Sequence, residues 1–176
     1  MSKKPDPIAE RKKYYHNQDQ AIKQFNTVIQ KLLEIAITKD QGNDTLLDAR
    51  TALKAIVKHD PEMAISYSKS YIWKYKDQIK TRDEQLFTNS DYSEDIKSIN
   101  KDQIADQQDT ETINQFIVGI KKIWMFLNKH EKSVVWNNFE TLLKSVAIYV
   151  SSEKKIKSYN KMIKDIDEQQ QYVRSI

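Results

Sequence analysis

Apolar residues in the first half of the chain recur three and four positions apart, which is the spacing of a helix with one buried face. The first stripe consists of Ile22, Phe25, Ile29, Leu32, Leu33, Ala36 and Ile37, the second of Leu46, Ala49, Leu53, Ile56 and Val57, and the third of Ala64, Ile65, Ser68, Ile72, Tyr75 and Ile79. The three stripes predict three helices. Alternation with a period of two, the pattern of a strand, is not sustained anywhere in the sequence.

Polar and helix-breaking residues separate these stripes. Gly42 and Asn43 end the first helix, and Thr45 with Asp48 three residues later has the spacing of a capping box at the start of the second. Pro61 starts the third helix, because proline fits the first helical position. We therefore expect short turns between the three helices.

Apolar stripes return after residue 112. They consist of Ile113, Phe116, Ile117, Ile120, Ile123, Trp124 and Leu127, then of Trp136, Phe139, Leu142, Leu143, Val146 and Val150, and last of Ile156, Tyr159, Ile163, Ile166 and Val173. They predict three more helices, with Trp124 and Trp136 on neighbouring helices where the two rings can touch. A polar, acidic connection at about 81–111 joins the two halves, and its residues 82–111 carry nine acidic and three basic side chains.

The composition narrows the fold class further. The 176 residues include two Gly, three Pro and no Cys, too few for the turns of a β-sandwich, for glycine-rich phosphate loops or for a thiolate metal site. No stretch approaches the roughly 18 apolar residues of a membrane span, and the first residues lack the apolar core of a signal peptide. The sequence thus predicts an all-α, single-domain helical bundle of five to six helices over residues 16–176. A flexible basic N-terminal arm, residues 1–15, precedes it.

Motifs in the middle of the chain resemble those of one known group. In order, they are His59-Asp60-Pro61, Tyr75-Lys76-Asp77-Gln78-Ile79, Arg82-Asp83-Glu84-Gln85-Leu86-Phe87, Asp91-Tyr92, Ile123-Trp124 and Lys132-Ser133-Val134-Val135-Trp136-Asn137-Asn138-Phe139. This succession resembles uncharacterised small helical proteins of nucleocytoplasmic large DNA viruses, over residues 45–150 or so. Lys74 stands where that group usually has proline, and Leu86 where it has an aromatic residue. The resemblance implies a viral origin and no reaction. The excess of Lys over Arg and of Ile over Leu, typical of an A/T-rich genome, agrees with it.

Aromatic residues form the first candidate contact surface. Trp73, with Tyr71 and Tyr75 beside it, exceeds what one buried helix face needs, and Trp and Tyr are typical anchors of protein interfaces. We expect these three residues to bind a protein partner, with Phe87 and Tyr92 beside them. The other interpretation of Phe87 and Tyr92 is that they fill the core.

Lysine clusters form the second candidate surface. Lys12 and Lys13 lie near the N-terminus, and the last helix carries Lys154, Lys155, Lys157, Lys161 and Lys164. Such clusters neutralise phosphates when they bind nucleic acid, although the scarcity of Arg argues against base readout. The other interpretation is an ordinary solvated helix face.

Residues for catalysis are harder to find. The histidines, His16, His59 and His130, lie in three separate segments without metal-ligand spacing. A cluster of carboxylates consists of Asp83, Glu84, Asp91, Glu94 and Asp95, and helix capping accounts for it better than acid–base chemistry. We therefore expect a non-enzymatic, virus-encoded helical interaction protein without a cofactor or a metal, either a minor virion component or a host-interaction factor. It would act in the cytoplasm of the infected cell or in the virion, with a viral or host protein partner and no membrane. The alternative is a nucleic-acid-binding accessory protein, and a homo-oligomer stays open.

Overall fold

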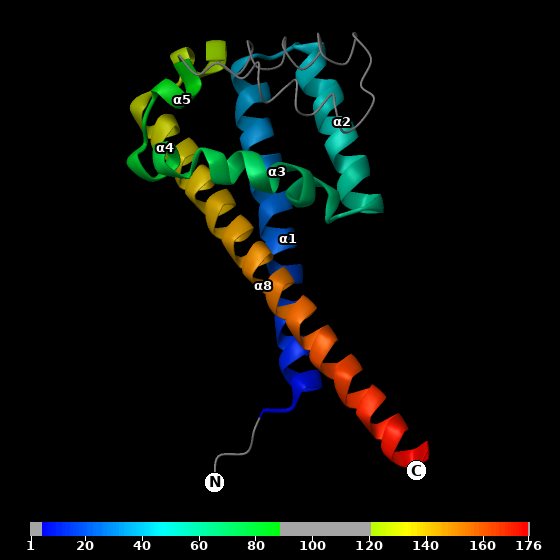
Figure 1. Cartoon of the computed structure of the whole chain (residues 1–176). Coiled ribbons are helices and arrows are strands. Elements are labelled where there is room, and N and C mark those ends of the chain that lie inside the picture. The colour runs from blue at the N-terminus through cyan, green and yellow to red at the C-terminus, as the bar shows by residue number, and fades with distance from the viewer. Residues whose placement is uncertain (1–4, 89–120, 176) are drawn as a thin grey trace, which may run out of the picture.

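Two long helices form the frame of the molecule. The computed structural model describes residues 5–88 and 121–175, and these residues form helices and no strand. Helix α1 spans Pro7–Lys39, helix α8 spans Lys129–Ser175, and the two run antiparallel to each other (Figure 1). The protein is all-α and folds as a single domain, as the sequence predicts.

Helix α1 begins earlier than the sequence predicts. The side chain of Asp6 accepts a hydrogen bond of 3.0 Å from the backbone N–H of Ile8, and Pro7 occupies the first turn, where its missing N–H is not needed. Further along, the ring of Tyr14 stacks on that of Tyr159 in α8, with 5.9 Å between their centroids. The prediction of a flexible arm is therefore wrong for residues 7–15, which are helical and pack on α8. Residues 1–4 lie outside the described part of the chain.

The last two predicted helices are one. Helix α8 continues through 47 residues, because no Gly or Pro interrupts the stretch between the stripes of Trp136 and Ile156. Its start is fixed by a reciprocal cap: the N–H of Glu131 donates to Oδ1 of Asn128 at 2.9 Å, and the N–H of Asn128 donates to Oε2 of Glu131 at 2.8 Å. Asn128 thus separates α8 from the helical residues 121–126.

Within residues 44–88, four shorter helices cover one end of the long pair. They are α2 (Asp44–His59), α3 (Met63–Lys74), α4 (Lys76–Thr81) and α5 (Gln85–Thr88). Helix α3 crosses the long pair, and α4 and α5 lie near the start of α8 (Figure 1). The predicted third helix is therefore divided in two, because the backbone leaves the helical conformation at Tyr75.

The helix starts differ from prediction in two places. Asn43 caps α2, accepting a hydrogen bond of 3.3 Å from the N–H of Leu46, so Thr45 lies inside the helix. Helix α3 begins at Met63 rather than at Pro61, after a turn closed by a bond from the N–H of Met63 to the carbonyl of Asp60.

The helices bury two adjoining apolar clusters, and the predicted stripes supply most of their side chains. The first lies where the last turns of α1 meet the start of α8, and its largest side chains are Phe87, Trp124 and Trp136. We call this part of the molecule the aromatic end. The second cluster lies midway along the pair, where Ile65 of α3 packs between Phe25 of α1 and Val146 of α8.

Candidate interaction sites

The predicted aromatic surface is not one surface. Trp73 is 47% exposed, and the ammonium of Lys76 lies 5.6 Å from the centroid of its ring. Tyr71 and Tyr75 are half-buried. Residues two positions apart on a helix project about 200° apart, so Tyr71 and Trp73 face different sides of α3. Tyr67, at 58%, is more exposed than any of them. The exposure of these aromatic side chains cannot be predicted from the sequence, because it depends on which face of α3 packs against the long pair.

Phe87 belongs to the core. It is 6% exposed, and its ring lies 4.3 Å from Trp124, 5.0 Å from Trp136 and 5.2 Å from Phe139, measured between centroids. The rings of Trp124 and Trp136 touch edge to face at 5.6 Å, which confirms the predicted pairing. The prediction that Phe87 contacts a partner is wrong, and its other interpretation, as a core residue, is confirmed. Tyr92 lies outside the described residues.

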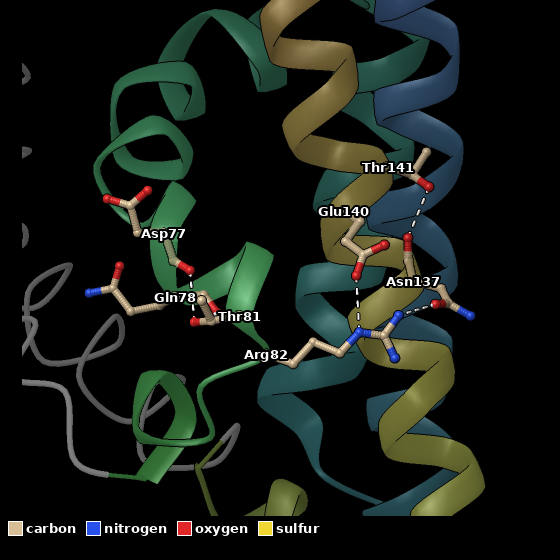
Figure 2. A network of polar contacts seen from close by, with 7 residues as sticks. All are labelled: Asp77, Gln78, Thr81, Arg82, Asn137, Glu140 and Thr141. Atoms are coloured by element: carbon tan, nitrogen blue, oxygen red, sulfur yellow. Dashed lines mark hydrogen bonds and ion pairs between the residues drawn. The ribbon is translucent and has the colours of Figure 1, made fainter.

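A polar clamp holds Phe87 in this position. Arg82 follows α4 in the left-handed conformation, with φ of 51°, and the chain turns there towards α5. Its side chain reaches α8, where Nε donates to Oε1 of Glu140 at 3.0 Å and an Nη atom donates to Oδ1 of Asn137 at 2.7 Å (Figure 2). The clamp fixes the turn, and thereby the short helix that carries Phe87, against α8.

The acidic candidates have structural partners. Oδ1 of Asp83 accepts a hydrogen bond of 3.0 Å from the N–H of Gln85 at the start of α5, which confirms a capping role. Glu84 lies 3.3 Å from the ammonium of Lys132. Asp91, Glu94 and Asp95 lie outside the described residues. Within residues 5–88 and 121–175, no group of three or more His, Asp or Glu side chains has the arrangement of a metal site.

The basic residues of α8 form a stripe. At 100° per residue, Lys154, Lys157, Lys161 and Lys164 share the face of the helix that points away from α1, while Lys155 projects to one flank. All five are exposed. Lys157 and Lys164 each lie near a glutamate on α8, at 3.9 Å and 3.7 Å, whereas Lys154 and Lys161 form no ion pair with the described residues. We call the four residues on this face the lysine stripe.

The other basic cluster does not join the lysine stripe. Lys12 and Lys13 lie level with it along the helix pair, because Arg11 donates a hydrogen bond of 2.9 Å to Asn160. Both lysines nevertheless project from the side of α1 that faces away from α8. The two clusters are therefore on opposite sides of the pair and cannot grip one duplex together.

The end of α8 extends beyond α1. Contacts of Arg11 with Asn160 and of Lys39 with Glu131 set the antiparallel register, which places Pro7 level with residue 163 or so. The following residues, 164–175, are all exposed and extend about 18 Å at 1.5 Å per residue. Figure 1 shows this red end of α8 apart from α1. We call residues 164–175 the free end of α8.

Apolar positions continue into the free end with the spacing of a coiled-coil seam. The seam consists of Ile156, Tyr159, Ile163, Ile166, Gln170 and Val173, alternately three and four residues apart. Ile156 is buried, Ile166 is 38% exposed and Val173 is 70% exposed. The same helix face that packs against α1 is thus progressively uncovered. The sequence shows this stripe, but it does not show where the opposing helix stops.

Comparison of the chain with protein-family models, with curated proteins and with solved structures gives no match. Among the helices of the described residues, none combines the length and the apolar character needed to cross a membrane.

Proposed function

We propose that this protein is a helical interaction protein, and that it binds a helix of a protein partner at the free end of α8. The observation that carries this proposal is the continuity of the seam: the positions that pack α8 against α1 recur, with unchanged spacing, beyond the start of α1. A partner helix that continues the line of α1 would cover Ile166 and Val173 in the way that α1 covers Ile156.

The composition of the free end supports a helix as the partner. A single polar residue in an otherwise apolar seam, here Gln170, is a device that fixes the register of paired helices. Three turns bury less area than the roughly 1,200 Å² of a standard stable interface, so we expect transient binding. As the resemblance of the sequence implies, the partner under this proposal is a viral or a host protein, met in the infected cell or in the virion.

Paired variants test this proposal. Ile166→Glu with Val173→Glu places two charges in the seam, and Ser158→Glu with Gln171→Glu places two charges outside it. Proteins that co-purify with the wild type and with the Ser158/Gln171 variant, but not with the seam variant, would support the proposal. The same proteins recovered with all three would contradict it. Sedimentation equilibrium of the three proteins shows whether the partner is a second copy of the chain.

A second candidate function rests on the lysine stripe. Four ammonium groups on one face of a helix could each displace a counterion from a phosphate of nucleic acid. Lys154→Glu with Lys161→Glu should abolish duplex binding under this function, and Lys12→Glu with Lys13→Glu, on the opposite side of the pair, should not. A titration from about 50 to 200 mM salt should show a log–log slope of about −0.9 for each phosphate contacted. Equal effects of both variants, or no binding at the lowest salt, would contradict the stripe as a nucleic-acid site.

A further inference from the structure

An apolar cavity of about 380 Å³ lies between α1, α2 and the aromatic end. Its described lining consists of apolar and aromatic side chains, without a charged or hydrogen-bonding group other than an indole. One wall, which includes Phe87 and Trp124, is buried. Other lining side chains are half-buried and include Leu32 and Ile35 of α1 and Leu53 of α2, so the cavity is open to solvent on the side of α1 and α2.

The size of this cavity distinguishes it from a packing defect. Protein interiors are close-packed, with few voids larger than a water molecule. An engineered apolar cavity of about 150 Å³ is already large enough to bind benzene. Water finds at most one hydrogen-bonding partner among these side chains, the indole N–H of Trp124, so the favourable occupant is a hydrocarbon of substantial length.

Two lysines lie about one helical turn from residues that line the cavity. On α1, Lys39 lies four residues after Ile35 and three after Ala36, both of which line the cavity. On α8, Lys132 lies three residues before Val135, another lining residue. Residues three or four apart are neighbours on a helix surface, so each lysine continues a row of lining side chains. The ammonium of Lys132 lies 5.0 Å from the ring centroid of Trp124. The ammonium of Lys132 thus lies next to a ring that lines the cavity.

The pairing of Lys132 leaves room for an anionic ligand. The Glu84 side chain that faces Lys132 at 3.3 Å is 57% exposed, and such surface pairs contribute little stability, so a ligand carboxylate can replace it. Lys39, by contrast, keeps its own partner: the pKa of Glu131 is lowered by its hydrogen bond to Lys39 and by the backbone N–H of Asn128, so this carboxylate stays ionised.

We propose that the cavity binds the chain of a free fatty acid, with the carboxylate held by Lys132 in place of Glu84 and the hydrocarbon lying against Leu32, Leu53 and Trp124. This site is separate from the free end of α8, and the two proposals stand or fall independently. Charge complementarity at Lys132 selects a carboxylate over a neutral lipid.

Calorimetric titration with octanoate, decanoate and dodecanoate, each below its micelle concentration, tests the hydrocarbon part. Affinity should rise about fourfold for each added methylene while the cavity has room, because each buried methylene contributes about 0.8 kcal/mol. The wild-type protein suffices for this series. Absence of saturable binding, or affinity independent of chain length, would overturn the proposal and leave the cavity to another occupant, such as a side chain of a partner protein.

Matched variants test the position of the chain and of the carboxylate. Ala49→Phe fills the cavity from α2 and should abolish binding, whereas Ala55→Phe, exposed on the same helix, should not. Lys132→Gln should weaken dodecanoate at least about tenfold and leave dodecanol unchanged, since only the acid makes a charge-assisted bond. Equal weakening of acid and alcohol, or equal effects of the two alanine variants, would show that the ligand lies elsewhere. Circular dichroism and melting curves confirm that each variant is folded.

Discussion

The aromatic end and the free end of α8 are built on the same helix but differ in what surrounds it. At the aromatic end, α1, α4, α5 and residues 121–127 pack around the start of α8, and Phe87 touches three other rings. At the free end, α8 continues as a helix although every side chain is exposed. The difference teaches that the sequence of α8 specifies a helix throughout, while burial depends on how many other elements reach each part of it.

The energetics should follow the same gradient. Burial of apolar surface contributes about 25 cal/mol for each Å² to the free energy of unfolding, and a solvated helix end contributes almost nothing. Substitutions should therefore cost most at the aromatic end, less in the middle and least at the free end. Three predictions test that order.

The largest loss is expected from Phe87→Ala. Removal of a buried aromatic side chain costs about 3–5 kcal/mol of unfolding free energy, because the transfer energy is lost and a cavity is left among Trp124, Trp136 and Phe139. Phe126→Ala is the matched control, since Phe126 is 64% exposed, and it should cost no more than about 0.5 kcal/mol. Urea denaturation measures both values. Similar values for the two variants would show that Phe87 does not anchor this end.

An intermediate loss is expected from Tyr149→Phe, in the middle of α8. The buried hydroxyl of Tyr149 donates a hydrogen bond of 2.5 Å to Oε1 of Glu62, and loss of such a bond costs about 1 kcal/mol. Burial, and then the neighbouring Glu62 carboxylate, raise the pKa of Tyr149 well above its usual value. A raised pKa in the folded state means that this tyrosine contributes fully below pH of about 10, where it is protonated in both states, and that the contribution falls as the pH rises further.

The pH dependence gives this second prediction its control. The stability difference between the wild type and Tyr149→Phe should be constant from neutral pH to about pH 10 and should then become smaller, because only the wild type loses the contribution of Tyr149. Tyr67→Phe removes an exposed hydroxyl and should match the wild type at every pH. A Tyr149→Phe curve that runs parallel to the wild type above pH 10 would contradict the shifted ionisation.

The sequence predicts the helices better than the way in which they are joined. The apolar stripes identify the buried faces of α1 and α8, since a period of 3.6 is a local property. The break expected between the stripes of Val150 and Ile156 is wrong. The apolar stripe moves around the surface of one continuous helix there, and in the sequence such a shift has the same pattern as two helices joined by a turn. The flexible arm expected at residues 1–15 is wrong over residues 7–15 for a similar reason: these polar residues are compatible with a solvated helix once Asp6 caps it.

The candidate sites depend even more on tertiary structure. Trp73 is exposed because of the face that α3 turns to the long pair, whereas Phe87 is buried because the Arg82 clamp turns α5 inward onto α8. The clamp joins residues more than fifty positions apart. The free end of α8 is defined by where α1 begins, and the cavity by the gap between α1 and α2. No local pattern contains these distances.

The smallest loss is expected from Ile166→Ala at the free end, and Ile156→Ala supplies its comparison. Both residues are isoleucines in the same seam of the same helix, but Ile156 is 6% exposed and Ile166 is 38% exposed. Ile156→Ala should cost about 2–3 kcal/mol, as for other buried isoleucines, and Ile166→Ala no more than about 0.5 kcal/mol. Urea denaturation at low protein concentration, where a transient partner is dissociated, measures the two values for the isolated chain. If Ile166→Ala cost as much as Ile156→Ala there, the free end would be covered within the chain itself. If its cost rose only when a partner was added, the difference would measure the contribution of Ile166 to that interface.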